Sequence, residues 1–251
     1  MRRHVGVGFL MVVGMSLGFW GCLDSKTEVT VNSDGSGSIE QVIYMKAQGL
    51  NAKEKTPDEM KADCEKSAKA LGEGVTVKSV TPLEPKGEWK GFKIVYAFAD
   101  ITKVKIGVIP PMGDLKTSPE DQYQFEFQAG AQPKLTIVRP PFKMGDDKED
   151  EKEPPAEMLA AFEGMKIAFG VRVNGTITNT NADAANVDKN AVALLRQDIG
   201  GIVRDKEAMK AAKAMGKVKD PKDIRAALKN PLVAKYIQLE PEERVTIEFK
   251  P

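Results

Sequence analysis

Hydrophobic and polar residues alternate with a period of two along much of the chain, which is the pattern of half-buried β-strands. The clearest example is the run at 165–173, whose apolar face consists of Met165, Ile167, Phe169, Val171 and Val173. Comparable patterns occupy residues 27–32, 38–45, 75–80, 92–99, 122–128, 135–138 and 243–251. Such alternation predicts a sheet with one buried face and one wetter face.

The first two strand patterns are separated by residues 33–37, which contain the pair Asp34-Gly35. Asp-Gly between two alternating runs is the strongest short-range hairpin signal, because both central residues of the favoured turn need a positive φ. Asn32, Asp34 and Gly35 are also similar to the start of a calcium loop, but the remaining ligand positions are missing. We therefore interpret the segment as a hairpin turn.

Helical patterns occur in two places. Residues 56–59 form a capping box with proline at the first helical position, which predicts a helix that ends at Gly72. Its apolar stripe includes Cys64, for which we expect core packing. Further helices are expected over 206–215 and from Asp220-Pro221 to about residue 229, and their apolar faces would let them pack as a hairpin.

These elements predict an α+β fold, an antiparallel sheet with a packed helix at about 56–71 and a C-terminal helical segment at about 206–229. The last strand pattern, at 243–251, should return to the sheet. We therefore expect residues 22–251 to form a single β-rich domain, in which 204–230 is a helical insertion before the last strand.

The N-terminal segment has the organisation of an export signal. Basic residues precede an apolar run from Val5 to Trp20, which is shorter than the roughly twenty residues of a transmembrane helix. The run ends at Gly21-Cys22, which resembles the lipobox of bacterial lipoproteins, where cleavage precedes a cysteine that receives lipid. We predict a signal peptide at 1–21 and lipid on Cys22. Because Phe19 and Trp20 depart from the lipobox pattern, cleavage elsewhere and retention as an anchor remain alternatives.

Charge and cysteine content refine this picture. Removal of residues 1–21 takes away Arg2 and Arg3 and leaves 35 basic against 36 acidic residues, so no attraction to nucleic acid is expected. Cys64 would then be the second of two cysteines in the mature chain. A disulfide between Cys22 and Cys64 is an alternative that requires Cys22 to carry no lipid.

The chain offers little catalytic chemistry. Its single histidine, His4, lies in the predicted signal, so the mature protein lacks the Ser-His, Cys-His and histidine-rich zinc sites of most hydrolases. A carboxylate-based hydrolase stays open as an alternative, since it needs only two acids in a cleft, but no motif selects such a pair. We predict no catalytic residue, no metal site and no cofactor.

Two proline-containing loops, at 109–114 and 139–146, carry apolar side chains at Met112, Phe142 and Met144. If these loops meet at one end of the sheet, the three residues would border an apolar ligand cavity or contact a bilayer. The alternative is that they fold back onto the core.

The lipobox-like Cys22, the hairpin at 34–37, the helix and the strand series together resemble the LppM-type bacterial lipoproteins. The segment 173–182, with a glycine followed by an Asn-Ala pair, is similar to the same family. The resemblance covers about 22–198 and implies a β-rich envelope domain described as binding lipid or glycolipid rather than catalysing a reaction. This chain departs from the family in its helices at 206–229 and in lacking a C-terminal membrane helix, so no site residue is carried over.

We therefore expect an exported, lipid-anchored, non-enzymatic envelope lipoprotein that binds an apolar or glycolipid ligand beside the membrane. The alternatives are a structural or protein-interaction lipoprotein without a ligand cavity, and the carboxylate-based hydrolase. The expected partners are the membrane, through the lipid on Cys22, a lipid or glycolipid ligand, and an envelope protein. Leu23 follows the cysteine where a retention aspartate would stand, which predicts the outer membrane, facing the periplasm, if the organism has two membranes.

Overall fold

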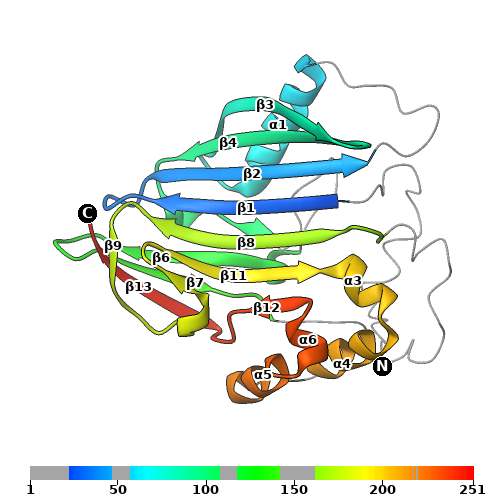
Figure 1. Cartoon of the computed structure of the whole chain (residues 1–251). Helices are drawn as coiled ribbons and strands as arrows, with labels where there is room; N and C mark the ends of the chain where they lie inside the picture. Colours follow the sequence, from blue (N-terminus) through cyan, green and yellow to red (C-terminus); the bar gives the residue numbers. More distant parts are fainter. Residues whose placement is uncertain (1–22, 47–56, 108–117, 142–161, 217, 219) are drawn as a thin grey trace, which may run out of the picture.

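The computed structural model describes residues 23–46, 57–107, 118–141, 162–216, 218 and 220–251. Its architecture is α+β, as the sequence predicted, with thirteen strands in two sheets and several helices (Figure 1). The predicted helix at 56–71 is confirmed as α1 (Pro57–Leu71), and it packs against β3 (Thr76–Lys86).

The larger sheet contains eight strands. Besides β3, they are β1 (Leu23–Val31), β2 (Gly37–Lys46), β4 (Trp89–Phe98), β8 (Lys166–Val173), β10 (Val187–Asp188), β11 (Ala191–Asp198) and β12 (Ile237–Leu239). The order is β10-β11-β8-β1-β2-β4-β3, and β12 also pairs with β11. One pair, β1 with β8, is parallel, whereas the other strand pairs of this sheet are antiparallel, as the sequence predicted. Between β4 and β8 the chain forms three strands of the second sheet, and β8 then pairs with β1 in the larger sheet.

The second sheet has five strands in the order β5-β6-β7-β13-β9. Their bounds are β5 (Ile106–Gly107), β6 (Gln122–Gln128), β7 (Lys134–Val138), β13 (Arg244–Lys250) and β9 (Thr176–Thr180). The final strand is therefore present as predicted, but it joins this second sheet and not the first. Alternation identifies a strand's faces and leaves its partners open, so a single sheet was the wrong expectation.

The C-terminal helical segment is confirmed by α4 (Lys206–Gly216) and α5 (Pro221–Leu228). Two short helices, α3 (Ile199–Arg204) and α6 (Pro231–Ala234), were not predicted. The main helix contacts of α4 are with α3 and α6, so the expected α4–α5 hairpin is replaced by a small cluster of four helices.

The core lies between the two sheets and beneath the helices. The apolar face of β8 points into it, with exposed fractions of 5% or less from Met165 to Val173 on that face. The ring of Phe169 meets that of Tyr123 from β6 at a centroid distance of 4.5 Å. Cys64 is also buried, which confirms its predicted place in the core.

The predicted first hairpin joins β1 and β2 through a turn at Gly35, whose φ is 84°. The Asn32 amide donates to Ser36 Oγ at 2.9 Å, and the Ser36 hydroxyl donates to Asp34 Oδ1 at 2.6 Å. These polar side chains therefore serve the turn itself, in agreement with the hairpin interpretation.

Candidate functional site

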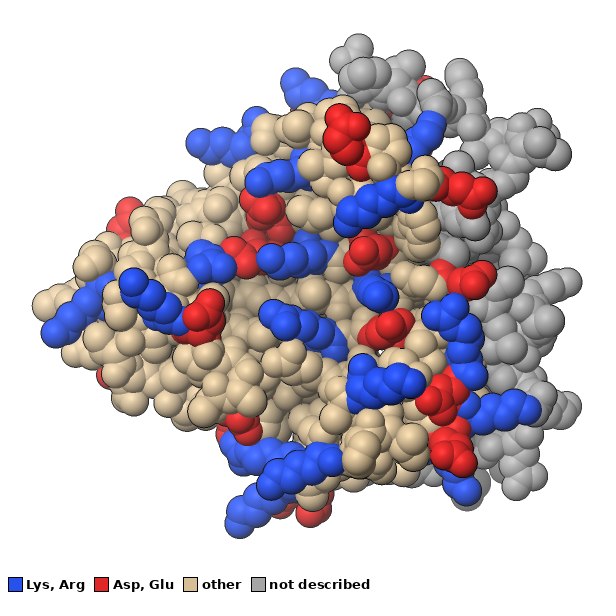
Figure 2. Space-filling model, in the orientation of Figure 1, with Lys and Arg blue, Asp and Glu red and all other residues tan. Residues whose placement is uncertain are grey.

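The outer face of the larger sheet carries charged residues of both signs, which are interspersed on the side of the molecule seen in Figure 2. The Arg172 guanidinium of β8 binds the Glu28 carboxylate of β1 at 2.8 Å, and Lys93 of β4 binds Glu40 of β2 at 2.6 Å. Cross-strand pairs of opposite charge stabilise adjacent strands modestly. The face as a whole therefore has no dominant sign of charge.

A groove of about 240 Å³ lies on this face over β8 and β11. Its floor is made of small residues, Ala168 and Gly170 from β8 and Ala191 and Ala193 from β11. A Cβ added to Gly170 would lie 3.2 Å from the Val192 carbonyl oxygen, so glycine lets the two backbones approach closely here. The groove exists because longer side chains from neighbouring segments rise around this low floor.

One wall of the groove holds a fixed ion pair. The Arg172 guanidinium donates to both Glu28 carboxylate oxygens and, at 2.5 Å, to Asn190 Oδ1. This contact with Arg172 lowers the pKa of Glu28 below its usual 4.5, and it raises the pKa of Arg172. Lys26 approaches Glu28 at 3.5 Å. Glu28 is therefore an ionised anchor for two cations at neutral pH.

Arg196 lines the same groove and differs from Arg172 in its exposure and its contacts. It is exposed, and within the part of the chain that the structure describes its guanidinium has no hydrogen-bond or ion-pair partner. Beside it, Gln238 donates to Asn186 Oδ1 at 2.8 Å. A guanidinium offers five donors in a planar fork that suits a carboxylate or phosphate. The groove can therefore bind an acidic group through Arg196.

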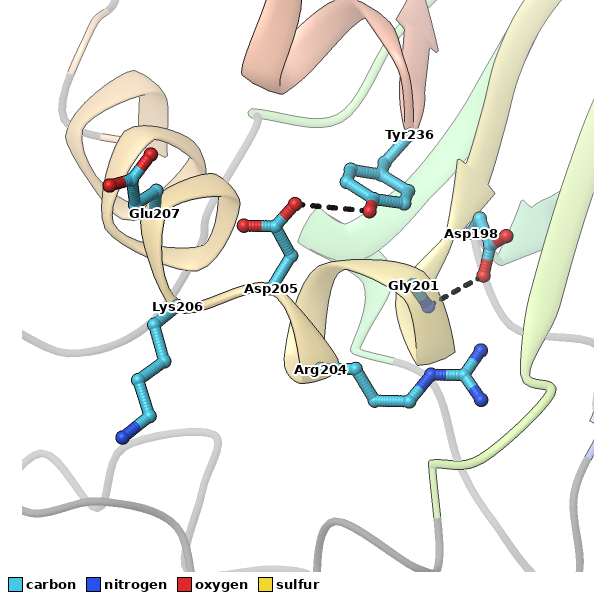
Figure 3. A pocket seen from close by; sticks show the side chains of 7 residues that line it. All are labelled: Asp198, Gly201, Arg204, Asp205, Lys206, Glu207 and Tyr236. Atoms are coloured by element: carbon cyan, nitrogen blue, oxygen red, sulfur yellow. Dashed lines mark hydrogen bonds between the residues drawn. The ribbon is translucent and has the colours of Figure 1, made fainter.

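A second pocket, of about 510 Å³, lies beside α3 and α4 (Figure 3). Its acids have local structural partners: Asp198 Oδ1 accepts from the Gly201 amide at 2.7 Å, and Asp205 Oδ1 accepts from the Ala208 amide at 3.0 Å. The Tyr236 hydroxyl donates to Asp205 Oδ2 at 3.1 Å. The hydrogen bond from Ala208 is the main reason why the pKa of Asp205 is lowered. These carboxylates cap helices.

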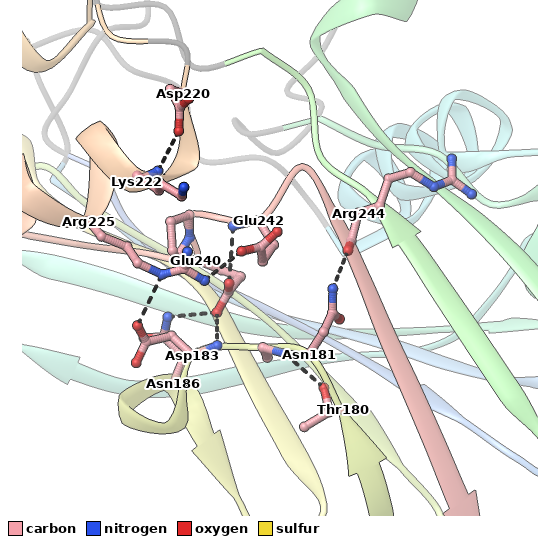
Figure 4. A network of polar contacts seen from close by, with 12 residues as sticks. Thr180, Asn181, Asp183, Asn186, Asp220, Lys222, Arg225, Glu240, Glu242 and Arg244 are labelled. Carbon is pink, nitrogen blue, oxygen red and sulfur yellow. Dashed lines mark hydrogen bonds and ion pairs between the residues drawn. The ribbon is translucent and has the colours of Figure 1, made fainter.

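Glu240 anchors a buried polar network near the end of β12 (Figure 4). Its side chain is 0% exposed, yet it accepts hydrogen bonds from the Asp183 amide at 2.9 Å, the Asn186 side chain at 2.9 Å and the Glu242 amide at 3.1 Å. Arg225 of α5 adds ion pairs to Asp183 and Glu242. The network joins α5, the segment after β9 and the link from β12 to β13.

Arg139, which follows β7, supports the same link. Its guanidinium is buried and donates to the carbonyl oxygens of Glu242, Pro140 and Pro241 at 3.1 to 3.4 Å. Burial lowers the pKa of Arg139. We assign both Arg139 and Glu240 to the architecture, because their polar atoms are used by the chain itself.

The residues predicted from sequence to contact lipid or ligand, namely Cys22, Met112, Phe142 and Met144, lie outside the described residues. Their predicted roles therefore stay predictions. The structure does describe the neighbour of Cys22: Leu23 is the first residue of β1, is 4% exposed and pairs with Met45. The sequence placed the start of this strand four residues later, at about Thr27.

The groove itself was not predicted. Its residues come from β1, β8, β11, β12 and the segment at 184–188, which are far apart in the sequence. The nearest available signal was the run of small residues at even positions of β8, Ala168 and Gly170, on the side opposite the apolar face. Strand pairing alone shows that this run lies beside Lys26 and Arg196.

Among the described residues, no three His, Cys, Asp or Glu side chains come together in a way that would hold a metal ion. In the same residues, no helix combines the length and the apolar character that crossing a membrane requires.

No protein-family model and no curated protein sequence matches this chain. Among solved structures, it is similar to the folded domain of the Mycobacterium tuberculosis LppM protein, determined by NMR. The sequence identity is 10%, the TM-score is 0.35, and the similarity covers 93% of each chain. This is a loose structural relationship.

Proposed function

We propose that this protein is an exported envelope lipoprotein, anchored by lipid on Cys22, whose folded body is a non-enzymatic interaction module beside the membrane. The observation that carries the proposal is the position of Leu23. It is buried and paired with Met45 in the larger sheet, directly after the predicted acylated cysteine. The lipid would thus be joined to the folded body without a spacer.

The state of the acidic residues supports a non-enzymatic role. A carboxylate-based hydrolase needs a general acid whose pKa is raised, next to an ionised partner. In the groove, the pKa of Glu28 is lowered by Arg172, and in the other pocket Asp198 and Asp205 cap helices. Glu28, Asp198 and Asp205 are therefore already engaged by structural partners.

The groove supports protein interaction over capture of an apolar ligand. The apolar face of β8 is packed into the core against residues such as Tyr123, so it does not line a ligand cavity. The groove on the opposite face is polar and presents Arg196. An acidic side chain or a chain terminus of an envelope protein would complement this guanidinium.

Site-directed photocrosslinking tests this function. A photoreactive residue in place of Ala193, on the groove floor, should give a discrete adduct with one envelope protein in intact cells. The adduct should be lost when Arg196→Glu is added, because the reversed charge repels an acidic partner. A photoreactive residue at Thr176, which is exposed on β9, is the matched control. An adduct that is unchanged by Arg196→Glu would contradict the assignment of the groove.

One observation favours the apolar or glycolipid ligand as a second candidate function. Ser25 Oγ, on the inner face of β1, is buried without a hydrogen-bond partner among the described residues. The neighbouring inner positions Thr27 and Gln41 are polar and buried too. Unsatisfied buried hydroxyls are rare and need an explanation, and a ligand head group is one.

Native mass spectrometry of protein purified from its own envelope tests this candidate. A bound lipid would appear as an adduct of defined mass, and Ser25→Ala should lower its occupancy if the hydroxyl contacts the head group. Recovery of the protein without any such adduct, from mild detergent, would count against a ligand.

The proposed location is the periplasmic face of the outer membrane if the organism has two membranes, since no retention aspartate follows Cys22. Fractionation of the two membranes should place the full chain in the outer one. Leu23→Asp should shift it to the inner membrane, while recovery of the native chain in the inner membrane would contradict the location.

A further inference from the structure

We infer that the end of the larger sheet at which β1 begins is a membrane-docking surface, with Trp89 and Met45 placed at the lipid interface. The inference rests on the proposed acylation of Cys22 and adds to it a surface of described residues. Figure 1 shows β1, β2, β8 and β11 side by side, with α3 and α4 at the end where β1 starts.

Several strands meet the same end in register. Leu23 at the start of β1 pairs with Met45, the next residue of β2, Lys46, pairs with Trp89, and Asp24 pairs with Lys166 at the start of β8. These residues therefore lie at one end of the sheet, where the strands start or finish, and this end is called the docking edge below.

The chain leaves little distance between this edge and the lipid. Consecutive Cα atoms lie about 3.8 Å apart, so Leu23 is one such step from Cys22. Because Leu23 is buried in β1, the strand cannot extend to lengthen the link without breaking its pairing with β2. An acyl chain in the bilayer would therefore hold this edge at the membrane surface.

The side chains at the edge suit that position. Met45 is the one exposed large hydrophobic side chain among the described residues, at 36%. Trp89 is partly exposed, and its ring lies close to Gly164, where an added Cβ would come within 2.9 Å of the indole. Gly164 precedes β8, so this contact joins the start of β4 to the segment that leads into β8. Tryptophan is enriched at membrane interfaces, where its apolar ring and polar N–H are both satisfied.

Charge does not supply the attraction at this edge. Lys166 pairs with Asp198 at 3.7 Å, and Arg204 pairs with Glu163 at 3.5 Å. Lys86, which pairs with Trp89 in the sheet, lies over the Tyr44 ring at 3.9 Å from its centroid. We therefore assign docking to the apolar side chains and not to these cations, and the occupant that fits is a lipid surface irrespective of its head-group charge. Docking should therefore occur on zwitterionic lipid and persist at high salt.

Tryptophan fluorescence provides a direct test with the native sequence. The chain has two tryptophans, Trp20 in the predicted signal peptide and Trp89, so Trp89 is the single reporter in the processed protein. The full chain, processed and acylated in cells, would be reconstituted into phosphatidylcholine vesicles with and without brominated acyl chains. We expect the Trp89 emission to move to shorter wavelength and to lose intensity with the brominated lipid.

The control places the reporter at the other end of the sheet. Trp89→Phe combined with Thr176→Trp puts the indole on exposed β9, beyond the far end of β8, where bromine should quench it much less. Equal quenching of the two reporters, or none of Trp89, in protein whose mass confirms acylation would overturn the docking surface and leave the lipoprotein proposal standing. A mature mass without acyl groups would overturn both.

Discussion

At the scale of single residues, the buried side chains of Glu240 and Arg139 join separate elements of the fold. Glu240 accepts three hydrogen bonds from groups that belong to two different loops, and Arg139 donates to three carbonyl oxygens of the chain around it. Buried polar side chains of this kind destabilise the fold when a hydrogen-bond partner is lost. The periodicity of the sequence gave no sign of either residue's role, because both lie outside the alternating runs.

Replacing Glu240 by glutamine should destabilise the fold. The Glu240→Gln amide would bring two donors toward groups that already donate, so at least one hydrogen bond is lost at a buried site, at a cost of about 2 kcal/mol. Urea titration measures this free energy of unfolding. Glu243→Gln, at an exposed neighbouring position, should change it by no more than about 0.5 kcal/mol. Equal effects of the two substitutions would contradict the role of Glu240.

The Glu28–Arg172 pair should make stability depend on pH in acid. The pKa of Glu28 is lowered below 4.5 in the folded protein, so the stability that the pair adds is fully present above pH 4.5 and lost as the pH falls through the lowered value. Both side chains are partly exposed, which limits the contribution to about 1 kcal/mol or less. The difference in unfolding free energy between the native protein and Glu28→Gln should therefore shrink in acid. A difference that stays constant with pH would exclude the pair as its source.

At the scale of elements, the sequence predicted most strands, α1 and the two longer C-terminal helices, because each has a regular period and clear end signals. β11 was missed because of a β-bulge between Ala193 and Leu195, which turns the consecutive residues Leu194 and Leu195 both inward and hides the alternation. β3 continues past its predicted end through Pro82, which the edge position of this strand permits.

Two glycines with positive φ allow a matched test of how the first hairpin packs on the second sheet. Gly74 has φ 78° with open space around it, whereas a Cβ at Gly35 would lie 2.9 Å from the Phe127 ring of β6. Gly74→Ala should cost about 1–2 kcal/mol for the left-handed conformation alone. Gly35→Ala should cost more, by about 1–3 kcal/mol of overpacking. Similar losses in thermal or urea unfolding would mean that the hairpin does not press on β6.

At the scale of the whole molecule, the proposed lipid anchor and docking surface orient the body, with the start of β1 at the membrane and the groove on the outer face of the sheet. The lipid site at Cys22 stays a prediction, and its signal is local to residues 1–22. The groove and the docking edge could not be predicted from the sequence, because each needs strand pairing to bring residues such as Lys26 and Arg196, or Lys46 and Trp89, together.

The central claim is that Cys22 is the acylated first residue of the mature protein. Mass spectrometry of the N-terminal peptide from the full chain, purified from envelope membranes, tests it most directly. The account predicts a peptide that begins at Cys22 and carries the added mass of fatty acyl groups, and that disappears in Cys22→Ser. A peptide that begins at Met1 or inside the 1–21 segment, or a Cys22 without lipid, would contradict the account.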